Sequence, residues 1–147
     1  MNLEPLFKKI NFVDRYQKIY EKYNDFDNRL STSNKKMYLE KIKIFDRSVI
    51  YHSKDKMFQV NFKYKSYSLN LGLSLHHGIV EARLFYIKDE EWLIYNRFDF
   101  ICEKLLNGFR EKYNIPKYRS EEELEDILKE IFSIYEDLKK EFIKQYN

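Results

Sequence analysis

The sequence has little of what disulfide frameworks, metal cages and tight turns require: one cysteine, three glycines and two prolines in 147 residues. With Cys102 alone the chain can form neither an intramolecular disulfide nor a thiolate cage, which favours a reducing, cytoplasmic setting. Three glycines also exclude a glycine-rich phosphate loop. We therefore expect a protein that folds without a cofactor and without a structural metal.

Long hydrophobic runs are missing as well. The longest apolar runs are about four residues, at 84–87 and 92–95, whereas a transmembrane helix needs roughly 20. The start, Met1 to Pro5, has no cationic segment followed by an apolar stretch, so it does not have the pattern of a secretory signal. The sequence predicts neither a membrane span nor export by the secretory route.

What the chain does contain is 44% hydrophobic, 35% charged and 18% aromatic residues. This composition excludes disorder throughout and suits a globular protein with large core anchors. The length is that of one domain, and neither an internal repeat nor a linker interrupts it. We therefore expect a single domain over residues 1–147.

The net charge of +3 conceals two unlike halves. Residues 1–70 carry 15 Lys or Arg against 8 Asp or Glu, whereas residues 71–147 carry 12 against 16. The basic excess is concentrated in 29–65, and this region predicts an acidic partner. The alternative is that these lysines are solvated charges on strand edges and turns, where they discourage aggregation.

Apolar spacings of three and four predict helices at both ends of the chain. Pro5 suits the first turn of a helix over about 4–23, and the polar segment 24–34 ends it. Helical spacing returns over 97–113. A capping box of Ser120 and Glu123 then opens a final helix of about 27 residues.

Between these helices the hydrophobic pattern changes to a period of two, which indicates half-buried strands. A short hairpin at Lys65 and Ser66 joins two of them, and polar corners at 53–56 and 88–91 separate others. The pattern predicts an antiparallel meander of four to six strands. The expected strands cover 37–45, 48–52, 58–64, 67–75, 79–87 and 92–95.

One-sided strands need a cover for their apolar side, and the N-terminal helix and the two C-terminal helices can supply it. The expected fold is therefore α+β. The other side of the sheet is then polar with apolar insertions, as in protein interfaces. The alternative is that a helix covers this side too, or that Phe85 and Ile87 pack under a loop. The predicted partner-binding residues are Gln59, Asn61, Glu81, Arg83 and Phe85 on this face, with Lys54, Lys56 and Lys63 at its rim.

No residue pattern predicts catalysis. Ser74 lacks the second glycine of a nucleophile elbow, and the carboxylates of 89–91 lie in one solvated corner. His76 and His77 are adjacent, so their side chains diverge, and a metal would need further ligands such as His52 or Glu81. The simpler reading of the histidine pair is a turn ending at Gly78, with one imidazole against aromatics and the other in solvent. Cys102 suits a buried thiol. We expect a protein that is not an enzyme.

Nucleic-acid binding is the alternative function. Aromatic residues alternate with lysine over 58–67, and such strands can stack bases and neutralise phosphates. A ribonucleoprotein-type aromatic signature is absent, and the C-terminal half is acidic. This alternative requires that basic side chains of the 29–65 region meet in one groove with exposed aromatics; the residues concerned are Lys41, Lys43, Arg47, Lys54, Lys56 and Lys63.

The layout of the whole chain, with the Ile79–Ile87 strand between flanking helices, resembles small cytosolic immunity proteins of bacterial toxin delivery systems. The resemblance implies a single α+β domain without catalytic machinery, which blocks one cognate toxin by direct binding through a charged surface. It rests on the layout and on no motif, so it assigns a role to no individual residue.

Overall fold

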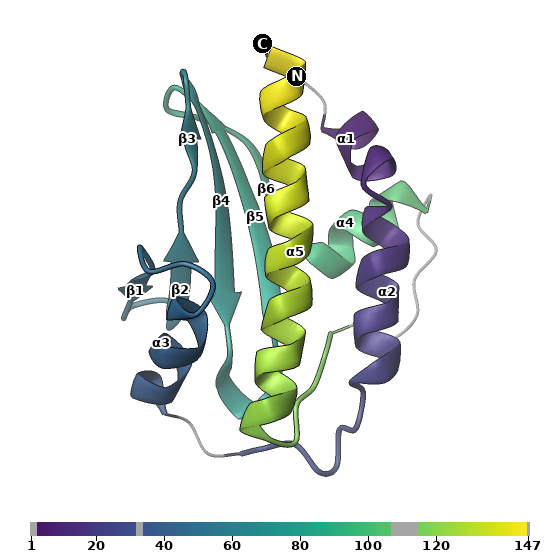
Figure 1. Ribbon diagram of the computed structural model, residues 1–147, viewed down its shortest axis with the longest axis vertical. Coiled ribbons are helices and arrows are strands. Elements are labelled where there is room, and N and C mark those ends of the chain that lie inside the picture. The colour runs from purple at the N-terminus through teal and green to yellow at the C-terminus, as the bar shows by residue number, and fades with distance from the viewer. Residues whose placement is uncertain (1–2, 32–33, 107–114, 147) are drawn as a thin grey trace.

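The computed structural model describes residues 3–31, 34–106 and 115–146, and it shows an α+β fold with a six-stranded antiparallel sheet (Figure 1). This confirms the predicted fold class. The helices are α1 (Glu4–Lys9), α2 (Phe12–Lys22), α3 (Lys35–Lys43), α4 (Phe98–Leu105) and α5 (Glu121–Tyr146), with a short 3-10 turn, η1, at His76–Gly78. The strands are β1 (Ile50–His52), β2 (Met57–Val60), β3 (Lys63–Tyr64), β4 (Tyr67–Ser74), β5 (Glu81–Lys88) and β6 (Glu91–Arg97).

The strands follow the order β1-β2-β4-β5-β6, and β3 pairs with the other end of β4. The predicted hairpin is confirmed, because Tyr64 faces Tyr67 across a two-residue turn. Lys65 adopts the left-handed conformation there, with a φ of 55°. The expected strand 58–64 is divided into β2 and β3. The turn between β5 and β6 lies beside the turn between β3 and β4, because the Asp89 amide donates to the Ser66 carbonyl over 2.7 Å.

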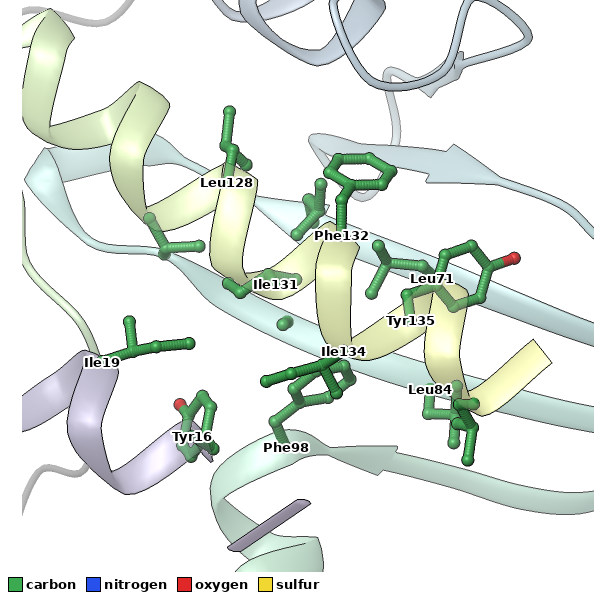
Figure 2. Packing of buried hydrophobic residues seen from close by; sticks show 14 of the residues in the cluster. Tyr16, Ile19, Leu71, Leu84, Phe98, Leu128, Ile131, Phe132, Ile134 and Tyr135 are labelled. Atoms are coloured by element: carbon green, nitrogen blue, oxygen red, sulfur yellow. The ribbon is translucent and has the colours of Figure 1, made fainter. Parts of the chain in front are cut away.

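The 26-residue helix α5 runs along the sheet and carries the centre of the core (Figure 1). Its start differs in detail from the predicted capping box. The Ser120 hydroxyl accepts from the Glu123 amide over 3.1 Å, as expected, but the Glu123 carboxylate accepts from Arg119 rather than from Ser120. Figure 2 shows the apolar side chains of α5 between those of the sheet and those of α2 and α4. The buried apolar side chains of α5 are Leu124, Ile127, Leu128, Ile131, Phe132, Ile134, Tyr135, Leu138 and Phe142.

Helices α1, α2 and α4 pack on the side of α5 away from β4 (Figure 1). The Phe12 and Phe98 rings lie 5.0 Å apart between α2 and α4. Arg15 of α2 binds Asp137 of α5 over 2.9 Å at the edge of this contact. Cys102 of α4 is buried, as predicted, and burial raises the pKa of its thiol to about 12.

The single N-terminal helix expected over 4–23 is interrupted, which corrects that prediction. Asn11 takes a left-handed conformation with a φ of 57° and separates α1 from α2. Asparagine tolerates this conformation better than most residues. The break turns the chain so that Phe7 and Phe12, on either side of it, both enter the core with ring centroids 4.9 Å apart.

The strand expected over 37–45 is wrong, because this segment forms helix α3. Asn34 caps the helix by accepting from the Met37 amide over 3.2 Å. Tyr38 and Ile42, one helical turn apart, are both fully buried. Of the helix expected over 97–113, α4 accounts for Phe98–Leu105, and 107–114 lies outside the described residues.

Candidate protein-binding face

The two sides of the sheet differ in chemistry. Residues such as Leu71 and Leu84 point toward α5 and are fully buried, whereas their neighbours Asn70 and Phe85 point the other way. We call this second side the open face. Its members are Ile50, His52, Met57, Gln59, Lys63, Ser68, Asn70, Gly72, Ser74, Glu81, Arg83, Phe85, Ile87, Trp92, Tyr95 and Arg97. The described helices that pack on the sheet do so on its other side, with α5 (Figure 1).

Three rings on β5 and β6 form a continuous cluster on the open face, which we call the aromatic patch. Phe85 lies 4.8 Å from Tyr95 and 5.8 Å from Trp92, and Trp92 lies 5.6 Å from Tyr95 between ring centroids. Trp92 is 59% exposed and Tyr95 is 62% exposed, whereas Phe85 is only 3% exposed. Phe85 therefore supports the two exposed rings from below.

A bulge in β6 brings the two exposed rings together. Tyr86 pairs with Ile94 and Ile87 pairs with Trp92, so Leu93 is an extra residue in β6. Without it, Trp92 and Tyr95, three residues apart, would point to opposite sides of the sheet. Neither ring was among the predicted binding residues.

Gly72 makes room for the base of the patch. A Cβ atom at this position would lie 2.7 Å from Cε2 of Phe85 and 2.7 Å from Sδ of Met57, closer than real contacts allow. The missing side chain lets Phe85 extend over β4 toward Met57. Phe85 was expected as an outward-facing anchor, and this is corrected: it lies on the open face but is covered by its neighbours there.

Beside the patch lies a set of ionised side chains, which we call the ionic cluster: Glu81, Arg83, Arg97 and Asp99. Arg97 binds the nearly buried Asp99 over 2.7 Å and Glu81 over 3.2 Å. The hydrogen bond to Asp99 raises the pKa of Arg97. Arg83 is held more loosely, 3.7 Å from Glu81 and 3.4 Å from the Ser74 hydroxyl. Its guanidinium is therefore the more available of the two for a further ligand.

The predicted polar residues Gln59 and Asn61 lie at the β2 side of the sheet and bind each other, with Gln59 Nε2 donating to Asn61 Oδ1 over 2.7 Å. Between them and the patch, Asn70 is nearly buried. Its Oδ1 accepts from the Ser68 hydroxyl over 2.8 Å. This row connects the β2 side with the aromatic patch through polar side chains.

The structure does not bring the three predicted rim lysines together. Lys54 and Lys56 lie in the β1–β2 turn, at the end of the sheet where Ser74 pairs with Glu81. Lys63 pairs with Ser68 at the opposite end of β4. The two ends are separated by about 20 Å at roughly 3.3 Å per residue.

The remaining basic residues named for nucleic-acid binding lie on α3 and in the loop that follows it. Lys41 lies on α3 and binds Glu125 of α5 over 2.9 Å, and this hydrogen bond raises its pKa. Lys43 ends the same helix, and Arg47 follows it in the loop before β1. Because Lys63 lies at the opposite end of the sheet from Lys54 and Lys56, the six residues do not all meet in one groove.

The histidine pair forms the turn η1 between β4 and β5, as predicted. His76 packs its ring against Tyr38, with centroids 5.9 Å apart, whereas His77 is exposed with a φ of 63°. Burial lowers the pKa of His76, and the nearby charge of Lys56 acts in the same direction. In the described part of the chain, no three His, Cys, Asp or Glu side chains are grouped so as to hold a metal ion.

His76 is expected to make the fold sensitive to mild acid. Its pKa is lowered in the folded state, so the unfolded chain takes up the proton more readily. Stability is then complete above the ordinary histidine pKa of about 6.5 and decreases as the pH falls toward the lowered value. The free energy of unfolding, measured with urea at a series of pH values, should fall less between about pH 7 and 5 for His76→Gln than for the unchanged protein. His77→Gln, at the exposed neighbour, should keep the pH dependence of the unchanged protein. The same pH dependence of stability in all three proteins would contradict the prediction.

Across the described ranges, no helix is both long enough and apolar enough to span a membrane. In comparisons with protein-family models, curated proteins and solved structures, the chain has no match.

Proposed function

We propose that the protein is a stoichiometric protein-binding inhibitor of the immunity type, which neutralises a cognate bacterial toxin in the cytoplasm by direct contact through the open face. The observation that carries this proposal is the aromatic patch, where Trp92 and Tyr95 are more than half exposed on a sheet whose other side holds the core. The choice of a toxin as the partner rests on the resemblance of the chain's layout to that of immunity proteins.

The patch has the properties of an interface centre. Tryptophan, tyrosine and arginine dominate the residues whose loss weakens protein complexes most, and all three types are adjacent here. Ring contacts with Phe85 hold Trp92 and Tyr95 in place before a partner arrives. Little conformational entropy is then lost on binding, which favours affinity.

The ionic cluster supports orientation rather than affinity. Arg83 presents a planar, charged donor to a carboxylate or carbonyl of the partner, while Glu81 and Arg97 hold each other in place. Gln59 and Asn61 offer neutral hydrogen-bonding groups at the β2 side. A partner that covers the face from β2 to β6 would meet a polar margin on one side and an apolar centre on the other.

The central test is capture of the partner from the native host, followed by binding measurements with purified proteins. Trp92→Ser is expected to weaken the complex by about 2 kcal/mol, roughly thirtyfold in Kd, because it removes a central aromatic contact. Phe26→Ser is the matched control, since Phe26 has the same 59% exposure but lies in the loop after α2. The partner should bind one to one and lose its toxic activity in the complex. Recovery of nucleic acid instead, or a Trp92→Ser protein with unchanged affinity, would contradict the proposal.

Lys54 and Lys56 are expected to affect the rate of association. Both are exposed in the β1–β2 turn, where they can attract an acidic partner from a distance. Reversing both to glutamate should slow association at low salt by about tenfold and leave dissociation nearly unchanged. The matched control reverses Lys18 and Lys129, on α2 and α5 away from the open face. Stopped-flow mixing at several salt concentrations measures the association rate of both double variants. Equal effects of the two charge reversals would argue against a role for this turn.

A further inference from the structure

Strand β6 leaves one edge of the sheet open. It is seven residues long and pairs with β5 only, and the described chain places no strand on its other side. The opposite edge is made by the much shorter β1 and β3, of three and two residues. Proteins commonly protect long edges with proline, lysine or a bulge; β6 contains neither proline nor lysine, and its bulge is confined to Leu93. An edge of this length and composition is suited to pairing with another strand.

We propose that this strand is a second copy of β6, so that two molecules form a symmetric dimer with one continuous sheet. The proposal does not depend on the proposed function, but it uses the same exposed rings, so a second copy and the proposed partner would compete for Trp92 and Tyr95. In an antiparallel arrangement about a two-fold axis, the Glu91 end of each strand meets the Arg97 end of the other. Arg97 stays bound to Asp99 and Glu81 of its own molecule, so the two strand ends meet without like-charge repulsion rather than through a new ion pair.

The side chains beside this edge match the same arrangement. Trp92 and Tyr95 lie on one side of β6, so the exposed rings of the two copies would meet across the axis on the open face. The half-buried Leu93 and Ile94 would meet the same residues of the other copy on the side of the sheet that α5 covers. With Glu91 opposite Arg97, the Leu93 bulge of each copy lies opposite Tyr95 of the other and interrupts the backbone pairing, so the aromatic contact supplies a large part of the interface.

The two-fold axis also closes the assembly. Each molecule uses the one long edge that the described residues form, and the short edge of β1 and β3 remains at the outer side. The product is therefore a dimer and not a fibre. A junction of two seven-residue strands is small beside the roughly 1,600 Å² of a standard interface, and we expect a reversible dimer that forms at micromolar concentrations or above.

Sedimentation equilibrium on the purified full chain tests the proposal. The average mass should rise from 18.3 kDa toward twice that value as the concentration increases from about 1 μM to 1 mM. Trp92→Ser and Glu91→Arg should each raise the dimer dissociation constant at least tenfold. Phe26→Ser, at an equally exposed ring outside β6, should leave it unchanged.

Hydrogen exchange locates the contact. At high concentration the amides of β6 should exchange more slowly than at low concentration, whereas those of β1, at the opposite edge, should not change. A constant mass near that of one chain up to 1 mM overturns the proposal, and so does a dimer that tolerates Trp92→Ser or leaves β6 unprotected. Partner binding by a strictly monomeric protein would leave the proposed function standing while removing the dimer.

Discussion

Removal of all residues after Arg119 is expected to leave a chain that does not fold. The deletion takes away α5 and its nine buried apolar side chains, from Leu124 to Phe142. Each contributes roughly 1.5 to 3 kcal/mol when fully buried, whereas the net stability of a domain is about 5 to 15 kcal/mol. The sheet also loses the hydrogen bond from the Tyr135 hydroxyl to the Leu69 carbonyl, at 2.6 Å.

Thermal unfolding followed by circular dichroism measures this effect. The truncated chain should show no cooperative transition, while a chain shortened only after Phe142 should keep one, because all nine buried side chains remain. A cooperative transition in the shorter chain would mean that α1, α2 and the sheet form a core without α5.

Gly78→Ala is expected to be the most damaging single change in a turn, at about 3 kcal/mol. Gly78 has a φ of 72°, where a side chain costs about 1 to 2 kcal/mol. A Cβ atom there would also lie 2.5 Å from Cβ of Arg29 and 2.9 Å from the Leu30 carbonyl oxygen. The Gly78 carbonyl meanwhile accepts from the Tyr118 amide over 2.9 Å, so the turn cannot move aside without losing that bond.

His77→Gly is the matched control for this turn. His77 also has a positive φ, of 63°, but its side chain is exposed, so glycine should fit with a change within about 1 kcal/mol. Urea unfolding should therefore give clearly different stabilities for the two variants. The melting temperature of Gly78→Ala should be lower than that of the unchanged protein by about 6 to 12 °C. Similar stabilities for Gly78→Ala and the unchanged protein would show that the loop carrying Arg29 yields easily.

The parts of the fold that the sequence predicted are those in which one pattern extends over many residues. The alternation from Tyr67 to Leu75 and the stripe from Leu124 to Phe142 each repeat the same choice several times, so local exceptions matter little. The α+β class follows from them. The histidine turn followed from a nearby glycine, a different and purely local signal.

The errors lie where a single residue decides the local structure. Asn11 breaks a continuous helical pattern by its left-handed conformation, which the spacing of its neighbours does not show. In α3 the buried Tyr38 and Ile42 are one turn apart, and Asn34 caps the helix. These signals were present in the sequence, but the helix is only nine residues long and its few apolar positions also fit a poor strand.

The candidate site was predicted only in part for a similar reason. The outward direction of Glu81, Arg83 and Phe85 follows from strand alternation. The pairing of Trp92 with Tyr95 does not, because it depends on the extra residue in β6. The burial of Phe85 depends on Gly72 in a neighbouring strand, and register between strands is not encoded in a local pattern.

The buried thiol of Cys102 has a practical consequence for dynamics. It is the only cysteine in the chain, and its raised pKa keeps it protonated, so a disulfide reagent can react only when α4 separates from the core. Because the reagent modifies no other side chain, the rate of the reaction reports the frequency of that opening. The natural sequence thus contains its own probe of local unfolding, next to Phe98 and the helices that cover the sheet.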